Sequence, residues 1–575
     1  FTELTHDYNK TEIINSWNDS GTGITYTYPS TSGFRDMYKS VKYPFVNWNN
    51  QIVVSDGTRG ISGNPELTSL EQAFRPFIHV KYLIDRIFEP TPFTYDSTFF
   101  STADFDKLYI DFNWGANDSS DNVTDSTWVG YPSSFYYLTT SYTTFLWENV
   151  NFSTNLGWDS VNRRFVAANN NTQYNIDGVG YYSNQAASNP LISARWGHYN
   201  SAGTLLDTFN VYSSNANEPT HNYNFVAILQ SGDYLQPEHK VDVASSFSRQ
   251  WDLNTPIKTS FINAVIGSGY VTTDSLLQRL RGETGQWEFI KGLITMFNLI
   301  TTPDKDNPNN IIIEPYVDVF MNNTADPLQW TDKVDTSEMK LTPLADLNKK
   351  TIFKFVEDDD DFAFTNYKNQ VGGHLYGSKK FNAGNEFNIL EGLNEVIAEP
   401  FAATVVKPLM SQYPLLRTPA LYAYNSEDDT SEGFENSPRI LYNNGIQGSG
   451  TTYYIPSQNG VAETEDQVNY LEFSHYKFGG TSLSAYRDFH FGECQLLTNQ
   501  ASTPYNLFNL YWLPYYSELY NPNTRIMTIK VNLTPADINT FKFSDTVQIK
   551  NRTFRVNKID YKPNDLATVE FILIP

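Results

Sequence analysis

Two acidic segments of the sequence contain the side chains that most often bind metal ions through oxygen. Glu357–Asp361 is an unbroken run of carboxylates, and Asp304–Asn310 alternates carboxylate and amide oxygens like half of a calcium loop. Calcium needs about six to eight oxygens that converge on one point. Consecutive side chains of a loop point apart, and the second segment lacks a central glycine and a spaced glutamate. We therefore predict a solvated loop at Glu357–Asp361, a turn at Asp304–Asn310, and no metal site.

The histidines and the single cysteine show no spacing typical of a catalytic or metal site. No HExxH pair is present among the histidines, and Cys494 has no CxxC partner, so we expect this cysteine to be buried rather than nucleophilic. His79 is expected on the exposed side of a helix. The sequence contains no GxSxG and no GxxxxGK[ST] motif. We predict no catalytic residue, no cofactor-binding residue and no cofactor, although scattered carboxylates leave sugar hydrolysis open.

Three tryptophans, Trp114, Trp128 and Trp147, lie in or beside a segment rich in Asn, Ser, Tyr and Gly. Indole rings in a receptor-binding module can stack on sugar rings. The commoner role of such rings is to pack in a core or on the face of a sheet, using their large apolar area. These three residues are the candidate contacts for a glycan or a protein partner, and both interpretations stay open.

Length and composition limit the architecture that must position such residues. A chain of 575 residues forms several domains, on the order of four at ~150 residues each. The net charge of −24 disfavours nucleic-acid binding, because phosphates are repelled. Aromatic residues make up 15% of the chain, which suits half-buried strand faces. The single cysteine excludes an internal disulfide. The sequence has no apolar run of about 18 residues, so we expect no membrane span.

The last fifty residues carry the clearest periodic pattern. Apolar residues there alternate at period two, which places them on one face of several short strands; they are Met527, Ile529, Val531, Leu533, Val547, Ile549, Phe554, Val556, Val569, Phe571 and Leu573. Thr534 can cap a helical turn that Pro535 opens. We predict a small β-barrel with one helical turn at its seam.

Helical spacing is confined to a few segments. Apolar positions predict helices over 76–88 and 286–299, with Thr284 as a possible cap for the second. Between them, 115–245 alternates in short runs separated by turn residues, which predicts an inserted β-sandwich.

The predicted fold is therefore mainly β with a few helices and several domains, combining small β-barrel domains with inserted β-sandwich-like domains. The expected divisions are 1–114, an N-terminal β/α domain; 115–245, an inserted β-rich domain; 246–410, a second helix-bearing domain; 411–510, an aromatic loop-rich insertion; and 511–575, a C-terminal small β-barrel.

Three segments together resemble a known family. Residues 525–575 contain "LTPADI", then "FSDTVQIKNRTFRVNKI", then a final strand. Gln286–Leu299 running on to Ile312–Tyr316 supplies a helix and then a strand, and Leu328–Asp335 reads "LQWTDKVD". These segments are similar to tail-hub and tail-tip proteins of tailed bacteriophages that infect Bacteroidota. The matching pieces cover under half of the chain.

The resemblance implies a structural virion protein and no enzyme. Proteins of this kind cap the tail tube, join it to the baseplate or fibres, and line the DNA conduit. The resemblance further implies that the small β-barrel domains are tube-like and that domains 1–114 and 246–410 are hub-like. We accordingly expect the chain to form a ring, as a homotrimer. Its expected partners are tail tube and baseplate or fibre proteins, with DNA passing unbound. Localisation would be the phage tail, after assembly in the host cytoplasm.

A carbohydrate-binding receptor-recognition protein is the alternative function, either a tail fibre or a cell-surface glycan binder. The aromatic- and Asn-rich insertions motivate it. A wall hydrolase fused to a hub is a third class, for which the residues offer no positive signal.

Overall fold

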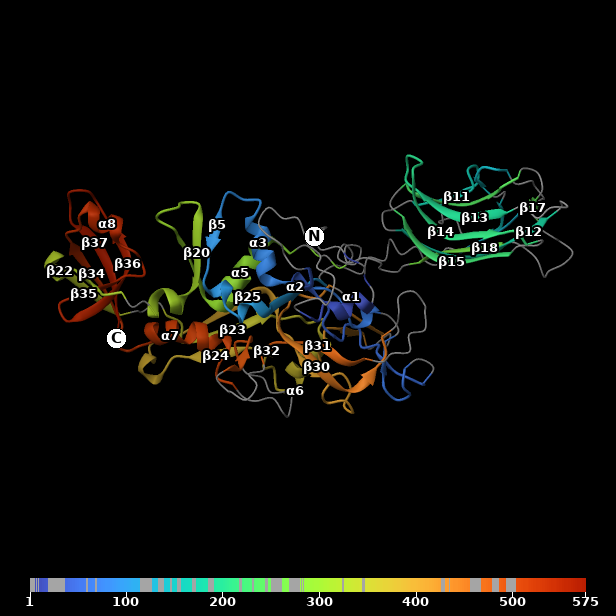
Figure 1. Ribbon diagram of the computed structural model, residues 1–575. Coiled ribbons are helices and arrows are strands. Elements are labelled where there is room, and N and C mark those ends of the chain that lie inside the picture. Colours follow the sequence, from blue (N-terminus) through green and yellow to red (C-terminus); the bar gives the residue numbers. More distant parts are fainter. Residues whose placement is uncertain are drawn as a thin grey trace. The chain divides into compact units, whose positions relative to one another are not determined.

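The chain folds mainly into β-sheets, with few helices and more than one compact unit (Figure 1). This computed structural model describes residues 6, 8, 10–18, 37–57, 60–67, 70–113, 127–132, 139–144, 147–152, 157–167, 172–184, 191–216, 220–229, 232–243, 247–249, 261–267, 280, 282, 284–322, 325–343, 347–425, 430–433, 435–455, 467–477, 485–492 and 503–574. The mainly β, multi-domain class predicted from the sequence is confirmed.

Two compact units make up the chain. The smaller comprises Phe1–Asn9, Asn117–Arg279 and Ser457–Val461, and the remaining residues form the larger. Strands β17 (Phe247–Arg249) and β18 (Phe261–Gly267) belong to the smaller unit, since both pair with its strand β12. The smaller unit therefore continues past residue 245, the boundary predicted from the change in composition.

The smaller unit is built from two six-stranded sheets, drawn as two layers in Figure 1. One sheet has the order β10 (Trp158–Asp159), β11 (Arg164–Val166), β16 (Tyr234–Val241), β13 (Ile192–Tyr199) and β14 (Leu205–Ser214), with β8 (Thr143–Thr144) pairing β16. The other has the order β15 (Thr220–Leu229), β12 (Thr172–Asn184), β18, β7 (Thr127–Pro132) and β9 (Trp147–Phe152), with β17 beside β12.

Residues from both sheets form one apolar core in this unit. Trp196 from β13 packs against Tyr223 of β15 in the other sheet, with ring centroids 5.6 Å apart, and lies 6.3 Å from Phe165 of β11. Side chains from facing sheets that share one core define a sandwich. The β-sandwich predicted from the alternating runs is therefore present.

A five-stranded sheet forms the centre of the larger unit. Its order is β1 (Val41–Lys42), β4 (Phe77–His79), β6 (Leu108–Asp111), β30 (Ile440–Tyr453) and β31 (Gln467–Ser474). Strands β30 and β31 come from the segment expected to form a separate aromatic insertion over 411–510, yet β30 pairs directly with β6. Edge-to-face contacts such as Phe77–Phe473, with centroids 5.2 Å apart, join β4 to β31 in this core although the two strands are far apart in the sequence.

Helix α5 (Gln286–Phe297) covers a smaller sheet of order β24 (Lys379–Asn382), β23 (Lys350–Val356) and β25 (Leu393–Ala402). A Cβ at Gly292 would lie 2.5 Å from the Phe401 ring, so only glycine allows this close packing. The helix spans almost the predicted range. Its cap differs from the Thr284 expectation: Gly285 precedes the helix and donates its N–H to the Glu288 carboxylate.

The remaining elements are short. A three-stranded sheet joins β19 (Leu299–Pro303), β20 (Asn310–Pro315) and β5 (Thr94–Asp96). Two-stranded pairs are β2 (Val53–Val54) with β3 (Pro65–Glu66), β26 (Val406–Pro408) with β27 (Arg417–Pro419), β28 (Ala423–Asn425) with β29 (Thr430–Glu432), and β32 (Tyr476–Lys477) with β33 (Arg487–Asp488). Among the described residues, the other α-helices are α1 (Lys10–Asn15), α2 (Met37–Ser40), α3 (Val80–Phe88), α6 (Phe362–Gln370), α7 (Leu513–Leu519) and α8 (Pro535–Thr540).

The C-terminal residues form a curled sheet together with a segment from much earlier in the chain. Four strands, β35 (Thr546–Ile549), β36 (Arg552–Asp560), β37 (Ala567–Leu573) and β34 (Arg525–Val531), lie in this order. Strand β21 (Leu328–Gln329) pairs with β35 at one end, and β22 (Val334–Pro343) pairs with β34 at the other. Residues 328–343 therefore contact both ends of the sheet and complete the barrel-like curl.

The apolar residues predicted for this barrel form one buried cluster, which confirms the alternation. Trp330 joins the cluster from the earlier segment and lies 6.1 Å from Phe571 between ring centroids. The predicted capped turn is also confirmed as α8, where Thr534 accepts from the Asp537 N–H and Asp537 accepts in return.

The helix predicted over 76–88 begins later than expected. Residues Phe77–His79 form β4, which pairs with β6, and α3 starts at Val80. A short run of apolar residues is compatible with both a helix and a strand. Here the three buried residues pair with β6, and this tertiary contact selects the strand.

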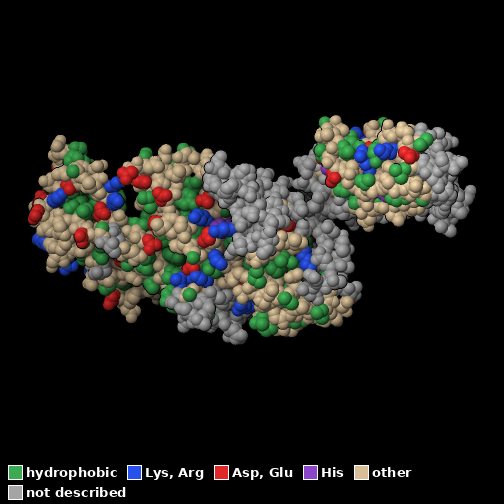
Figure 2. Space-filling view, in the orientation of Figure 1, with side chains coloured by type: hydrophobic (Ala, Val, Ile, Leu, Met, Phe, Trp, Pro, Cys, Tyr) green, Lys and Arg blue, Asp and Glu red, His purple; other side chains and the backbone are tan. Residues whose placement is uncertain are grey.

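Acidic and basic side chains are interspersed over the face of the molecule in Figure 2, without gathering by sign. Within the part of the chain that the structure describes, none of the helices is long and apolar enough to cross a membrane.

Candidate functional site

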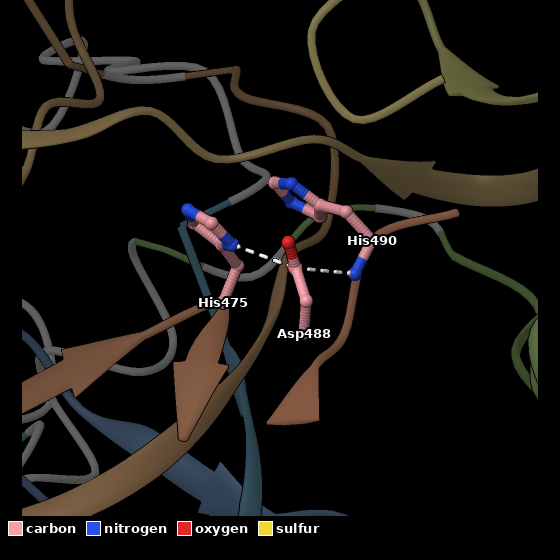
Figure 3. Close-up of side chains that lie close together, drawn as sticks. All are labelled: His475, Asp488 and His490. Atoms are coloured by element: carbon pink, nitrogen blue, oxygen red, sulfur yellow. Dashed lines mark hydrogen bonds and ion pairs between the residues drawn. The ribbon is translucent and has the colours of Figure 1, made fainter. Parts of the chain in front are cut away.

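His475, Asp488 and His490 lie together in the interior of the larger unit (Figure 3). The antiparallel pair β32–β33 brings Tyr476 opposite Asp488, which places His475 beside the carboxylate. His490 follows two residues after Asp488. All three side chains are buried, with at most 3% exposure.

Hydrogen bonds fix the orientation of the first histidine. The His475 Nδ1–H donates to Asp488 Oδ1 at 2.9 Å, and the His490 backbone N–H donates to the same oxygen at 3.0 Å. With Nδ1 protonated, the Nε2 of a neutral His475 accepts from the Tyr376 hydroxyl at 3.2 Å. Tyr376, His475 and Asp488 thus form a continuous chain of hydrogen bonds.

The two imidazoles are stacked, and this geometry does not suit a shared metal ion. Their centroids are 4.1 Å apart and their planes are parallel within 6°. A metal lies in the plane of each imidazole that binds it, at roughly 2.0–2.1 Å from the nitrogen. Lone pairs that run in two parallel planes do not converge on one point. The arrangement of these described residues therefore does not fit one metal held by both histidines.

His490 is held as a neutral ring. Its Nε2 accepts from the Thr404 N–H at 3.3 Å, which assigns the proton to Nδ1. Burial, and then the neighbouring His475 and Arg439, hold the pKa of His490 well below its usual range. Gly377 leaves room for this ring: a Cβ there would lie 2.9 Å from the imidazole, and its φ of +75° favours glycine.

A buried arginine with three carboxylates lies close enough to influence His490. Arg439 is fully buried, and its guanidinium contacts Asp358 at 2.7 Å and Asp361 at 2.9 Å. Its backbone N–H donates to Asp111 Oδ1 at 2.7 Å. Burial raises the pKa of Asp361, and the nearby Arg439 opposes that rise. This cluster connects β6, β30 and the N-terminus of α6.

The acidic run was predicted to be a solvated loop, and this is wrong for two of its members. Asp359 and Asp360 are exposed, but Asp358 and Asp361 are buried against Arg439. Asp361 also caps α6 by accepting from the Phe364 N–H at 3.0 Å. The run is therefore a structural element whose inward-facing acids balance a buried cation. Asp304–Asn310 does form a turn between β19 and β20, closed by a hydrogen bond from Asn310 to Asp304.

The expectation for His79 was also wrong. This side chain is 5% exposed and precedes α3, and its Nε2 contacts the Asp106 carbonyl at 2.8 Å. Burial lowers the pKa of His79 to about 4. Its strand β4 lies inside the central sheet, which the helical interpretation did not include.

The structure does not bring together Trp128 and Trp147, the two candidate tryptophans within its described residues. Trp128 lies opposite Phe152 and Trp147 lies opposite Pro132, so they occupy opposite ends of the β7–β9 pair. Trp114 and Cys494 fall outside the described residues.

Sequence reasoning missed the His475–Asp488–His490 cluster and Arg439. The alternation Asp488-Phe489-His490 was a usable local signal, because residues two apart in extended chain share a face. The pairing with His475 and the approach of Asp358 to Arg439 depend on chain crossings that no local pattern shows.

Comparisons with known proteins leave the family open. No protein-family model matches the chain, and no curated protein matches it in sequence. Among solved structures, murine APRIL at pH 8.5 is 13% identical, with a TM-score of 0.20, over 25% of this chain and 99% of that chain. Eiger TNF from S. frugiperda (11% identity, TM-score 0.19, 25% and 94% covered) and the globular domain of zebrafish complement 1qA (10%, 0.18, 24% and 94%) are similar to the same low degree. These scores are too low to assign a fold or a function.

Proposed function

We propose that the chain is a structural protein of a phage tail, a hub or tail-tip component that joins the tail tube to the baseplate or fibres. The observation that supports this most is that the three hub-like sequence segments contact one another. Leu328–Asp335 and 525–575 share the curled sheet, although they are almost two hundred residues apart in the sequence. If the likeness of these short motifs to hub proteins were a coincidence, there would be no reason for the matching segments to lie in one sheet.

The third segment contacts the barrel through named side chains. Lys305, between β19 and β20, donates to the Asn539 carbonyl at 3.0 Å. Arg555 of β36 contacts the Tyr316 hydroxyl at 2.8 Å and the Glu518 carboxylate at 2.7 Å. Charge-assisted bonds from one arginine to several partners define an orientation. The barrel is thereby tied to the end of β20 and to α7.

Ring assembly follows from the proposal, as a homotrimer whose neighbours are tube and baseplate or fibre proteins. In the order of the curled sheet, β22 stands at an end, and its residues Met339 and Leu341 are 50% and 56% exposed. Unpaired strand edges accept a further strand, and a closed ring covers them. The net charge of −24 disfavours tight binding of passing DNA.

Electron microscopy and mass photometry of the purified chain test this function. We expect a ring with a central channel, assembled from identical copies. A stable monomer without a ring at micromolar concentration would count against the hub.

Two variants test whether β22 lies at the ring contact. Leu341→Asp is expected to convert rings into folded monomers, because a charge would be buried at the contact. Ile389→Asp is the matched control, since Ile389 is 86% exposed outside the curled sheet, and it should leave the rings intact. Equal loss of rings in both variants would argue against β22 as the contact.

A further inference from the structure

A cavity of about 220 Å³ opens in the larger unit, and none of the three residues of the His475–Asp488–His490 cluster lines it. Its walls come from 3₁₀ turns near the N-terminus (η3, Phe99–Ser101; η4, Phe105–Lys107), the end of α5, the π-helical turn η6 (Val317–Met321) and the turn η10 (Phe508–Trp512). Drug-sized ligands usually occupy roughly 300–1,000 Å³. The cavity therefore suits a ligand about the size of a single ring.

The floor of the cavity is aromatic and rigid. Phe99 and Phe297 lie 5.1 Å apart between ring centroids, and Phe297 lies 5.3 Å from Tyr511 at an angle of 88°. Phe105 packs against both phenylalanines, at 5.2 and 5.9 Å. Rings that interlock edge to face cannot collapse into the space beside them, so the cavity is preformed.

The rim of the cavity carries charges of both signs. Asp104 and Arg487 line it as an ion pair, with Arg487 Nε 3.6 Å from Asp104 Oδ2, and Lys477 contacts the other carboxylate oxygen. Asp318 lines the cavity and is held by Asn322, whose Nδ2 donates to it at 2.7 Å. A donor and an acceptor placed side by side favour a neutral ligand that carries both kinds of group over an ion of either sign.

Tyr511 offers the cavity both an aromatic surface and a polar group. Its ring is part of the aromatic floor, and among the described residues no hydrogen bond reaches its hydroxyl. Tyr511 lines the cavity together with Asp104 and Arg487 of the charged rim. Burial and then the Asp104 carboxylate raise the pKa of Tyr511, so its hydroxyl stays protonated and can donate a hydrogen bond.

We propose that this cavity binds one neutral sugar ring, such as the terminal hexose of a glycan. The apolar C–H face of a pyranose would lie on the aromatic floor, and vicinal hydroxyls would bond Asp104, Arg487 and Tyr511. Aromatic faces suit such a ring because they bury its apolar side while its hydroxyls stay hydrogen-bonded. The site does not depend on the proposed tail function, because no residue of β22, the proposed ring contact, lines the cavity.

Saturation-transfer NMR on the full chain tests the proposal with methyl glycosides of glucose, galactose, mannose and N-acetylglucosamine as probes. We expect transfer to the ring protons of at least one glycoside. Tyr511→Phe removes only the hydroxyl and should weaken binding roughly 2- to 12-fold, the range of one net hydrogen bond. Thr102→Trp at the exposed rim fills the cavity and should abolish the signal.

Tyr520→Phe is the matched control, since the Tyr520 hydroxyl donates to the Asn348 carbonyl outside the cavity. It should bind as the parent chain does. Absence of transfer to all four glycosides overturns the proposal, and so does transfer that Thr102→Trp leaves unchanged. Thermal unfolding of each variant separates a lost site from a lost fold, and neither result bears on ring assembly.

Discussion

The curled C-terminal sheet and the polar centre of the larger unit are stabilised in opposite ways. The sheet encloses a single cluster of apolar side chains, to which Trp330 is added from a distant segment. The polar centre instead buries Arg439, with Asp358, Asp361 and Asp111 around it, and the stacked His475 and His490. Burial of an apolar side chain needs no particular partner, whereas a buried charge needs its counter-charge in place.

This difference predicts how each region responds to substitution and to acid. The apolar cluster should tolerate changes in proportion to the volume removed. The polar centre should fail when any one charge is left without its partner, because the remaining charges stay buried.

The largest effect is expected for Arg439→Met. Three carboxylates would lose the cation that offsets their burial, at a cost of about 3–5 kcal/mol in the free energy of unfolding. Chemical denaturation followed by tryptophan fluorescence measures it. Arg552→Met is the matched control on an exposed arginine of β36 and should change stability by less than about 0.5 kcal/mol. Similar losses in the two variants would remove the contrast between the regions.

Trp330→Leu tests whether the early segment completes the curled sheet. Leucine fills only part of the space between Phe541 and Phe571, so we expect a loss of about 2–3 kcal/mol. Hydrogen exchange should rise in β34 and β35, the strands that the segment joins. Trp287→Leu, on a tryptophan that is 69% exposed, is the control. Unchanged exchange in both strands would show that the sheet holds without residue 330.

Acid should destabilise the polar centre and the central sheet, which contains His79, before the curled sheet. Burial lowers the pKa of His79 to about 4 and holds the pKa of His490 well below its usual range, so the unfolded chain binds these protons first as the pH falls below 6.5. The contribution of each neutral histidine to the free energy of unfolding is complete above pH 6.5. It declines by up to about 1.4 kcal/mol per pH unit as the pH falls toward the pKa of that histidine in the folded protein.

The curled sheet responds at lower pH because residues 525–575 contain no histidine. Hydrogen bonds from Lys333 and from Thr534 lower the pKa of Asp537 to about 2. The contribution of the ionised Asp537 to the free energy of unfolding is therefore lost only between about pH 4 and 2. Hydrogen exchange at pH 7 and pH 5, corrected for intrinsic rates, should rise at 77–79 and 488–490 and not at 525–531. His374→Gln, on an exposed histidine, should leave this pattern unchanged. A simultaneous rise in all three segments would contradict the ordering.

Thr534→Ala should give the smallest effect. The variant removes the side-chain cap of α8 and should lower the free energy of unfolding by about 1 kcal/mol. Thr336→Ala, on an exposed threonine of β22, is the comparison and should be nearly neutral. Thermal unfolding measures both, and a neutral Thr534→Ala would mean that packing alone holds the turn.

Local patterns were sufficient where one face of one segment is buried. Alternation from Met527 to Leu573 predicted the core of the curled sheet, and Thr534-Pro535 predicted the start of α8. The same reasoning failed at Phe77–His79, because three buried residues match both helical and strand spacing and only the pairing with β6 decides between them. It failed again at Asp358 and Asp361, where composition alone suggests solvent.

The sequence by itself determined the mainly β class, the sandwich, the capped turn and the apolar face of the C-terminal strands, because these depend on neighbours within a few residues. Only the tertiary structure decided that residues 328–343 complete the C-terminal sheet, that β30 pairs with β6, and that Arg439 lies among three carboxylates. These contacts join residues tens to hundreds of positions apart. Long-range pairing is selected by the total burial and charge balance of the folded chain, and a local pattern carries no information about it.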